Sequence, residues 1–296
     1  MRTSPRADDR SNAAAVLDAE LLRSWPMPVE RDGDKYSRGT VLVIGGSPST
    51  PGAVVLCGSA ALRMGAGRLQ IATADAVAEM VAMAVVESRT IGIPTTSSGG
   101  FNDGPTDELA EAIRTADAVV VGPGMLPDRG TVRFIEGVLE CVSDNSLVVL
   151  DALALTNFGD VDNGLRQRVA SQLLMTPNKQ EAEALVDAPC ADHDEALRCA
   201  ANATGAVLSS FGIVQSPDGR RWRTVGNPAG LGTSGSGDVL AGLVGGAASR
   251  SGDRLQSACW ATFAHIEAGR RLAESVGELG YLARDLLHEI PRCLPR

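Results

Sequence analysis

The residues best suited to chemistry lie late in the chain, where an acid follows a glycine-rich loop. The segment Gly235-Ser236-Gly237-Asp238 opens a helical pattern that continues through Ala247. Backbone N–H groups at the start of a helix lack intrahelical partners and bind anions. An aspartate beside them can accept a proton from a substrate hydroxyl. The segment therefore predicts phosphoryl transfer to an alcohol, with Asp238 as the base and the neighbouring amides as the phosphate cradle.

A purely structural interpretation of the same segment stays open at this point. Aspartate is a common helix cap, so the segment could be only a capped helix start that contributes about 1 kcal/mol. Half of the residues from Gly226 to Gly237 are glycine or proline, however, and none is bulkier than Leu231. A loop this long and small suits a polyphosphate that lies across the backbone, which favours the functional interpretation.

Two further glycine-bearing turns, at residues 45–47 and 122–124, follow runs of apolar residues. In an open parallel sheet, ligands bind at the carboxyl ends of the strands, where such turns gather. Taken singly, each is more often a simple turn. Their recurrence at several strand ends predicts one cleft.

Alternating strand and helix patterns predict the sheet that would bring these turns together. Strand patterns lie at residues 40–44, 68–73, 90–94, 118–121, 147–151, 173–176 and 206–209. Helical patterns lie between several of them, at residues 52–64, 74–83, 107–114, 129–141 and 179–186. This alternation predicts an α/β fold with a central, mostly parallel sheet and helices on both faces. Residues 213–225 form a hairpin pattern, and a mainly helical carboxyl-terminal part follows from Gly237 to Ile290.

Composition limits the possible partners. The chain has 296 residues, of which 44% are hydrophobic and 21% charged, and its net charge is −9. This acidity argues against nucleic-acid binding, which needs a basic surface. No stretch approaches the roughly 18 apolar residues of a membrane span. The six cysteines form no C-x-x-C pair, so we expect packed, reduced thiols in a cytoplasmic protein with neither a nucleic-acid nor a membrane partner.

The pattern along the chain indicates two parts. Residues 1–35 form a polar N-terminal leader in which arginines and acids interleave. Residues 36–296 contain all the strand and helix patterns, with mostly short loops and no low-complexity linker. We therefore expect a single α/β domain over residues 36–296.

Four segments, in chain order, carry a family resemblance. They are VLVIGGS and PGAVVLCGSAALRMGAG within residues 39–67, VVVGPGM at 119–125, VVLDALAL at 148–155 with LMTPNKQEAEAL at 174–185, and NPAGLGTSGSGDVLAG at 227–242. Together they resemble the ADP/ATP-dependent NAD(P)H-hydrate dehydratases, which have a ribokinase-like fold. The last segment alone is shared with vitamin kinases of that fold.

The resemblance implies a metabolite-repair reaction. Hydrated NADH or NADPH is phosphorylated on its ring hydroxyl by ADP or ATP, phosphate leaves, and the cofactor is restored, which makes the enzyme a hydro-lyase. Asp238 would deprotonate the hydroxyl. The hydrated-cofactor site would comprise Ala53, Gly124, Asn178 and Asp238. The implied nucleotide site comprises Leu208, Ser209, Ser210, Phe211, Gly212, Gly235, Ser236 and Gly237.

Two positions depart from the family pattern. Asn178 stands where the family usually has histidine, and an amide cannot take up a proton. The stretch from Leu208 to Gly212 has no lysine where the family has Lys-Gly, so a cation near the phosphates is missing. Leu208 and Phe211 in this stretch either take part in binding, Phe211 by stacking on the ligand, or pack in the core, and the sequence leaves both open.

Other charged and titratable residues match no catalytic spacing. We expect the three arginines of the hairpin pattern to form a solvated face. We expect the histidines to be structural or at the surface. These residues are Arg220, Arg221, Arg223, His193, His265 and His288.

Two other functions remain as alternatives: a vitamin-precursor kinase of the same fold, and a catalytically weak nucleotide-binding relative. For the dehydratase we expect hydrated NAD(P)H and an adenine nucleotide as partners, Mg²⁺ with unknown protein ligands as the cofactor, and a homo-oligomer.

Overall fold

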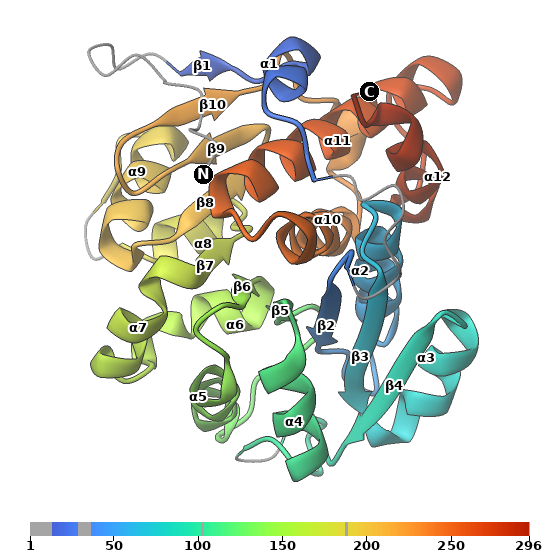
Figure 1. Cartoon of the computed structure of the whole chain (residues 1–296), viewed down its shortest axis with the longest axis vertical. Helices are drawn as coiled ribbons and strands as arrows, with labels where there is room; N and C mark the ends of the chain where they lie inside the picture. Colours follow the sequence, from blue (N-terminus) through green and yellow to red (C-terminus); the bar gives the residue numbers. More distant parts are fainter. Residues whose placement is uncertain (1–13, 29–36, 102–103, 187–188, 296) are drawn as a thin grey trace.

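The structure, a computed structural model, describes residues 14–28, 37–101, 104–186 and 189–295. Within these residues ten strands form one sheet, in the order β1-β10-β9-β8-β7-β6-β5-β2-β3-β4 (Figure 1). Strands β2 to β8 are parallel, and β9 pairs antiparallel with both β8 and β10. The strands are β1 Ala15–Val16, β2 Thr40–Ile44, β3 Arg68–Ala74, β4 Ser88–Ile93, β5 Ala118–Val121, β6 Leu147–Leu150, β7 Leu173–Met175, β8 Val207–Ser210, β9 Ile213–Gln215 and β10 Arg221–Arg223.

Helices cover both faces of this sheet, as the strand–helix alternation predicts (Figure 1). Packed with one face are α1 Ala19–Ser24, α2 Gly52–Arg63, α10 Ser236–Ser251, α11 Arg254–Ser275 and α12 Ala283–Cys293. Associated with the other face are α4 Asp107–Thr115, α5 Thr131–Cys141, α6 Ala152–Thr156, α7 Asn163–Val169, α8 Lys179–Ala184 and α9 His193–Thr204. Helix α3, Ala78–Ala84, packs beside β3 and β4. Short 3-10 helices lie at Asp75–Val77, Phe158–Asp160, Ala170–Gln172 and Ala229–Leu231.

The central strands are buried on both faces, which explains their apolar sequence. All five residues of β2 are buried, and alternate residues face different hydrophobic clusters: Val41 and Val43 face the α10 side, while Leu42 and Ile44 face the opposite side. A parallel strand covered by helices on both faces has this pattern. The predicted α/β fold with a mostly parallel sheet and a helical carboxyl-terminal part is confirmed.

The helices of the carboxyl-terminal region are interrupted more often than the sequence pattern predicts. Gly252, in a left-handed conformation with φ of 61°, ends α10 and separates it from α11. Residues 276–282 then separate α11 from α12. Because α10 packs tightly on α2, the first of these three helices is held against the sheet. The start of α10 is therefore fixed relative to the strand ends.

Part of the expected N-terminal leader packs on the domain. Leu17, Leu22, Trp25 and Met27 are buried in the same hydrophobic cluster as α10 and α11. Strand β1 extends the sheet beside β10, and the indole Nε1 of Trp260 donates a hydrogen bond to the carbonyl of Trp25 at 2.9 Å. Because charged residues are interleaved with these few large apolar side chains, the composition of the segment predicts only a polar leader. The boundary expected at residue 35 lies outside the described residues.

The strand order reverses its direction between β2 and β5. Strand β2 lies between β3 and β5, so the chain leaves β2 toward one edge of the sheet and later returns on its other side. Open α/β sheets bind ligands at such a switch point. Here the two glycine turns meet: the N–H groups of Gly46 and Ser47 donate to the carbonyls of Pro123 and Gly124, both at 2.8 Å. The turns at residues 45–47 and 122–124 therefore meet, as predicted.

Candidate active site

Only small residues fit where these turns approach α2. A Cβ added to Gly124, whose φ is 65°, would lie 2.8 Å from the Cβ of Ala53 and 2.6 Å from the carbonyl oxygen of Thr50. The hydroxyl of Thr50 donates to the carbonyl of Gly124 at 2.8 Å and holds the turn against the helix. The structure therefore brings together two predicted site residues, Ala53 and Gly124.

Asp238 lies in the first turn of α10, whose start carries no side-chain cap. The N-cap residue is Gly235, with φ of 87°, which has no side chain to accept from the N–H groups of the first turn. The interpretation of Asp238 as a simple N-cap is therefore wrong. Partial burial raises the pKa of Asp238 to about 6. The carboxylate stays ionised at neutral pH, yet it is a much better proton acceptor than an exposed aspartate.

A second acid, Asp151, follows β6 at the same edge of the sheet. Its side chain is 5% exposed and accepts a hydrogen bond from the hydroxyl of Thr176 at 2.7 Å. Burial raises its pKa to about 7; the charges of Asp238 and Glu181 add to the rise, and the Thr176 hydrogen bond opposes it. A Cβ on Gly122 would lie 1.8 Å from the carbonyl oxygen of Asp151. Asp151 is thus in contact with the 122–124 turn.

The charge of Asp238 contributes to the raised pKa of Asp151. The buried thiol of Cys57 on α2 feels both charges, which together with burial raise its pKa well above the usual value. Sequence reasoning gave Asp151 no role, although it stands within VVLDALAL. The available signal was an acid directly after a wholly apolar strand.

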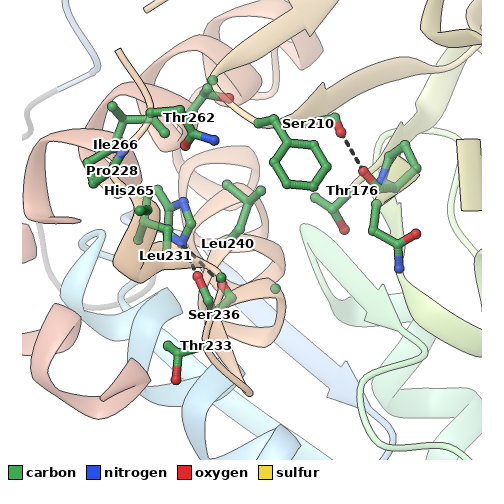
Figure 2. A pocket seen from close by; sticks show the side chains of 18 residues that line it. Thr176, Ser210, Pro228, Leu231, Thr233, Ser236, Leu240, Thr262, His265 and Ile266 are labelled. Carbon is green, nitrogen blue, oxygen red and sulfur yellow. Dashed lines mark hydrogen bonds between the residues drawn. The ribbon is translucent and has the colours of Figure 1, made fainter. Parts of the chain in front are cut away.

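A cavity of about 330 Å³ opens beside the start of α10 (Figure 2). Its walls come from the ends of β7 and β8, the loop from Asn227 to Thr233, the first turns of α10, and α11. A volume of this order fits small-molecule ligands. The predicted site residues that line it are Asn178, Ser210, Phe211, Gly212, Ser236 and Gly237.

Leu208 and Ser209 do not line this cavity. Leu208 is wholly buried in the hydrophobic cluster on the opposite face of the sheet from α10. Ser209 is also buried, and its hydroxyl is 2.6 Å from that of Thr262 on α11. Side chains of β8 alternate between two buried faces, so the nucleotide-binding role predicted for Leu208 finds no support in its side-chain position.

Phe211 stands out from the core. Its side chain is 51% exposed, its φ is 47°, and its ring meets that of His193 edge-on with centroids 5.4 Å apart. The interpretation of Phe211 as an ordinary core residue is therefore wrong. The Nε2 atom of His193 is 2.9 Å from the hydroxyl of Ser210, which donates to the carbonyl of Pro177 at 2.6 Å. Half-buried His193 therefore contacts both Ser210 and Phe211 in the cavity wall.

Asn178 is held in one orientation at the rim of the same cavity. It caps α8: its Oδ1 accepts from the N–H of Glu181 at 3.0 Å, and the Glu181 carboxylate accepts from the N–H of Asn178 at 2.8 Å. This reciprocal capping box uses the side-chain oxygen of Asn178. The side-chain amide group keeps its donors for other partners.

His265 is the clearest site residue that sequence reasoning missed. It is 7% exposed, lies on α11 and lines the cavity. Its Nε2 atom is 3.0 Å from the hydroxyl and 3.1 Å from the carbonyl oxygen of Ser236. Burial lowers the pKa of His265 to about 4, so the ring is neutral. His288, by contrast, is exposed, as expected.

The arginines of the hairpin are engaged in ion pairs. Arg221 and Arg223 pair with Asp194, and Arg220 pairs with Asp218 at 2.6 Å.

The described part of the chain contains no group of three or more His, Cys, Asp or Glu residues that could hold a metal ion. These side chains therefore build no dedicated Mg²⁺ cage, and we assign no protein ligand to this ion. Nor is any helix of the described residues long and apolar enough to cross a membrane.

Comparison with solved structures defines the class of fold. The structure is similar to a ribokinase-like superfamily protein from Enterococcus faecalis V583, with a TM-score of 0.81 and 20% identity over 99% of this chain and 98% of that one. It is also similar to the ADP/ATP-dependent NAD(P)H-hydrate dehydratase from Bacillus subtilis co-crystallised with ATP/Mg²⁺, with a TM-score of 0.76 and 22% identity over 95% and 97% of the two chains. The fold is ribokinase-like.

Sequence comparison identifies the family within that fold. The family described as NAD(P)H-hydrate dehydratase matches residues 41–292, so the chain belongs to this family. It is 39% identical to an ADP-dependent (S)-NAD(P)H-hydrate dehydratase from Xanthomonas campestris pv. campestris, over 95% of this chain and 96% of that protein. It is 30% identical to the bifunctional NAD(P)H-hydrate repair enzyme Nnr from Escherichia coli, of which the alignment spans 51%.

Proposed function

We propose that this chain restores NADH and NADPH from their hydrated forms, with ADP or ATP as the phosphoryl donor. One observation carries the proposal: a partly buried carboxylate, Asp238, stands at the uncapped start of α10. Its chain neighbours Ser236 and Gly237 line the cavity, while the second acid, Asp151, contacts the 122–124 turn. The name of the Xanthomonas relative supports ADP as the donor.

In this proposal the two ligands lie on either side of Asp238. The hydrated nicotinamide ring binds against Ala53 and Gly124, and Asn178 offers its free amide donors. The nucleotide occupies the cavity, where Phe211 supplies an apolar surface. The remaining nucleotide contacts come from Ser210, Gly212, Ser236 and Gly237 in the cavity wall, and from the backbone of Gly235 at the helix start.

The first step is phosphoryl transfer. The ring hydroxyl oxygen attacks the terminal phosphorus, a new P–O bond forms, and the P–O bond to AMP or ADP breaks. Asp238 accepts the hydroxyl proton; an acceptor with a pKa of about 6 performs this step well near neutral pH. Unpaired N–H groups of the α10 start hold the charge that develops on the phosphoryl oxygens.

The second step is elimination. The C–O bond breaks, phosphate leaves with the electron pair, the adjacent ring carbon gives its proton to water, and the ring double bond returns. We propose that Mg²⁺ arrives with the nucleotide and neutralises phosphate charge. This fits the habit of the ion of binding through substrate phosphates. The expected homo-oligomer remains a prediction.

The test measures products as well as rate. The purified protein is incubated with hydrated NADPH, ADP and Mg²⁺, and the absorbance of the reduced nicotinamide ring is followed together with AMP and inorganic phosphate. The proposal expects one AMP and one phosphate for each NADPH restored. A stable phosphorylated ligand without ring recovery would identify a kinase instead. Nucleotide binding without any product would identify a silent nucleotide-binding relative.

A further inference from the structure

His265 presents a hydrogen-bond acceptor to the cavity. A carbonyl oxygen can only accept, and the Ser236 carbonyl lies 3.1 Å from Nε2, so the proton of the neutral ring belongs on Nε2. That placement also suits the Ser236 hydroxyl oxygen at 3.0 Å, which can accept as well. With the proton on Nε2, the other ring nitrogen, Nδ1, has a free lone pair.

Nothing in the described protein uses this lone pair. Within the described residues Nδ1 has no hydrogen-bond partner, and it is not among the polar atoms sealed from solvent without one. The cavity surface around the ring is mainly apolar; in Figure 2 the ring lies between the side chains of Leu231 and Leu240. An acceptor in such a wall is satisfied only by a ligand donor or by water.

The chemistry of Nδ1 excludes phosphate as its partner. A bare nitrogen lone pair and an ionised phosphate oxygen are both acceptors, and the ring stays neutral well below physiological pH. An adenine nucleotide carries two kinds of donor, the sugar hydroxyls and the exocyclic amine. Since Nε2 of the same ring touches Ser236 at the tip of α10, Nδ1 lies within one ring width of the proposed phosphate cradle. The sugar is the part of a nucleotide that lies next to its phosphates.

We propose that Nδ1 of His265 accepts a hydrogen bond from a sugar hydroxyl of the bound nucleotide, which makes His265 a specificity residue for ribonucleotides. This inference rests on the proposed nucleotide site. It assigns two tasks to one ring: Nε2 positions the α10 start, and Nδ1 recognises the sugar.

Two substitutions separate these tasks. His265→Gln keeps an N–H donor near the position of Nε2 but has no atom at the position of Nδ1. His265→Asn keeps an acceptor near the position of Nδ1 but loses the reach to Ser236. Circular dichroism and unfolding curves for both variants show whether each one folds.

Calorimetric titration of each protein with ADP, 2′-deoxy-ADP and 3′-deoxy-ADP tests the proposal without requiring turnover. For the wild type we expect one of the deoxy analogues to bind about five- to tenfold more weakly than ADP, as for the loss of one hydrogen bond. We expect His265→Gln to bind that analogue and ADP equally, and His265→Asn to keep the preference.

The inference is overturned if the wild type binds all three nucleotides alike, or if His265→Gln keeps the full preference. Failure of the wild type to bind ADP would overturn both this inference and the proposed function. A sugar preference that depends on His265, in a protein that restores no NADPH, would sustain this inference and reject the proposed function alone.

Discussion

Replacing Asp151 by asparagine tests the electrostatics of the site through stability alone. The substitution keeps the shape of the side chain and an oxygen that can accept from Thr176, but it removes the charge. Burial raises the pKa of Asp151 from 3.8 to about 7. The folded state therefore holds this proton more tightly than the unfolded state does.

The sign of the effect follows from proton linkage. Between about pH 4 and pH 7 the unfolded chain ionises freely while folded Asp151 resists, so wild-type stability falls as the pH rises through this window. Raising the pKa of Asp151 from 3.8 to about 7 lowers the free energy of unfolding of the wild type by at most roughly 4 kcal/mol. This full cost of ionising folded Asp151 is reached above about pH 7. Asparagine removes this cost. We expect Asp151→Asn to be more stable than the wild type by about 2–4 kcal/mol near pH 8, with the gain shrinking toward pH 4.

Urea unfolding curves at several pH values measure this difference. Asp144→Asn, which removes a charge from an exposed turn, is the matched control and should change the free energy of unfolding by less than about 0.5 kcal/mol. A gain for Asp151→Asn that does not vary with pH, or a loss near pH 8, would refute the reasoning.

Three further predictions concern the base, the helix packing and the cavity. The value of kcat/KM should fall about tenfold per pH unit below pH 6, where Asp238 takes up a proton, and a flat pH–rate profile would count against its role as the base. Gly242→Ala would place a Cβ 2.0 Å from the carbonyl oxygen of Cys57. We therefore expect urea unfolding to show that the free energy of unfolding falls by about 1–3 kcal/mol. The control Gly159→Ala, where nothing lies within 4 Å of the added Cβ, should change it little. Phe211→Gly removes a half-exposed ring from a left-handed backbone position, so ADP titration should show several-fold weaker binding with no loss of folding stability.

The sheet and the contact between its two glycine turns can be predicted from the sequence because they depend on local patterns. The unbroken apolar run from Thr40 to Ile44 predicts a buried parallel strand, and the glycine turns at 45–47 and 122–124 predict the strand ends that meet. The small loop before Asp238 likewise predicts the helix start. In each case the physical cause lies within a few consecutive residues.

Other parts of the site depend on contacts between distant segments. His265 lies 29 residues after Ser236, and no periodicity predicts that its ring reaches the start of α10. The burial of Asp151 depends on the covering helices, and its hydroxyl partner Thr176 directly follows the neighbouring strand β7. The sequence left the packing of Leu208 open, because a family pattern identifies the strand but not the face of the sheet to which each side chain points.

The most direct test of the central claim is the amount of NADPH restored by Asp238→Asn from hydrated NADPH and ADP, compared with the wild type and with Asp144→Asn. We expect kcat to fall at least about a hundredfold in Asp238→Asn while ADP still binds, and we expect full activity in the control. Undiminished turnover by a folded Asp238→Asn protein would contradict the assignment of Asp238 as the base.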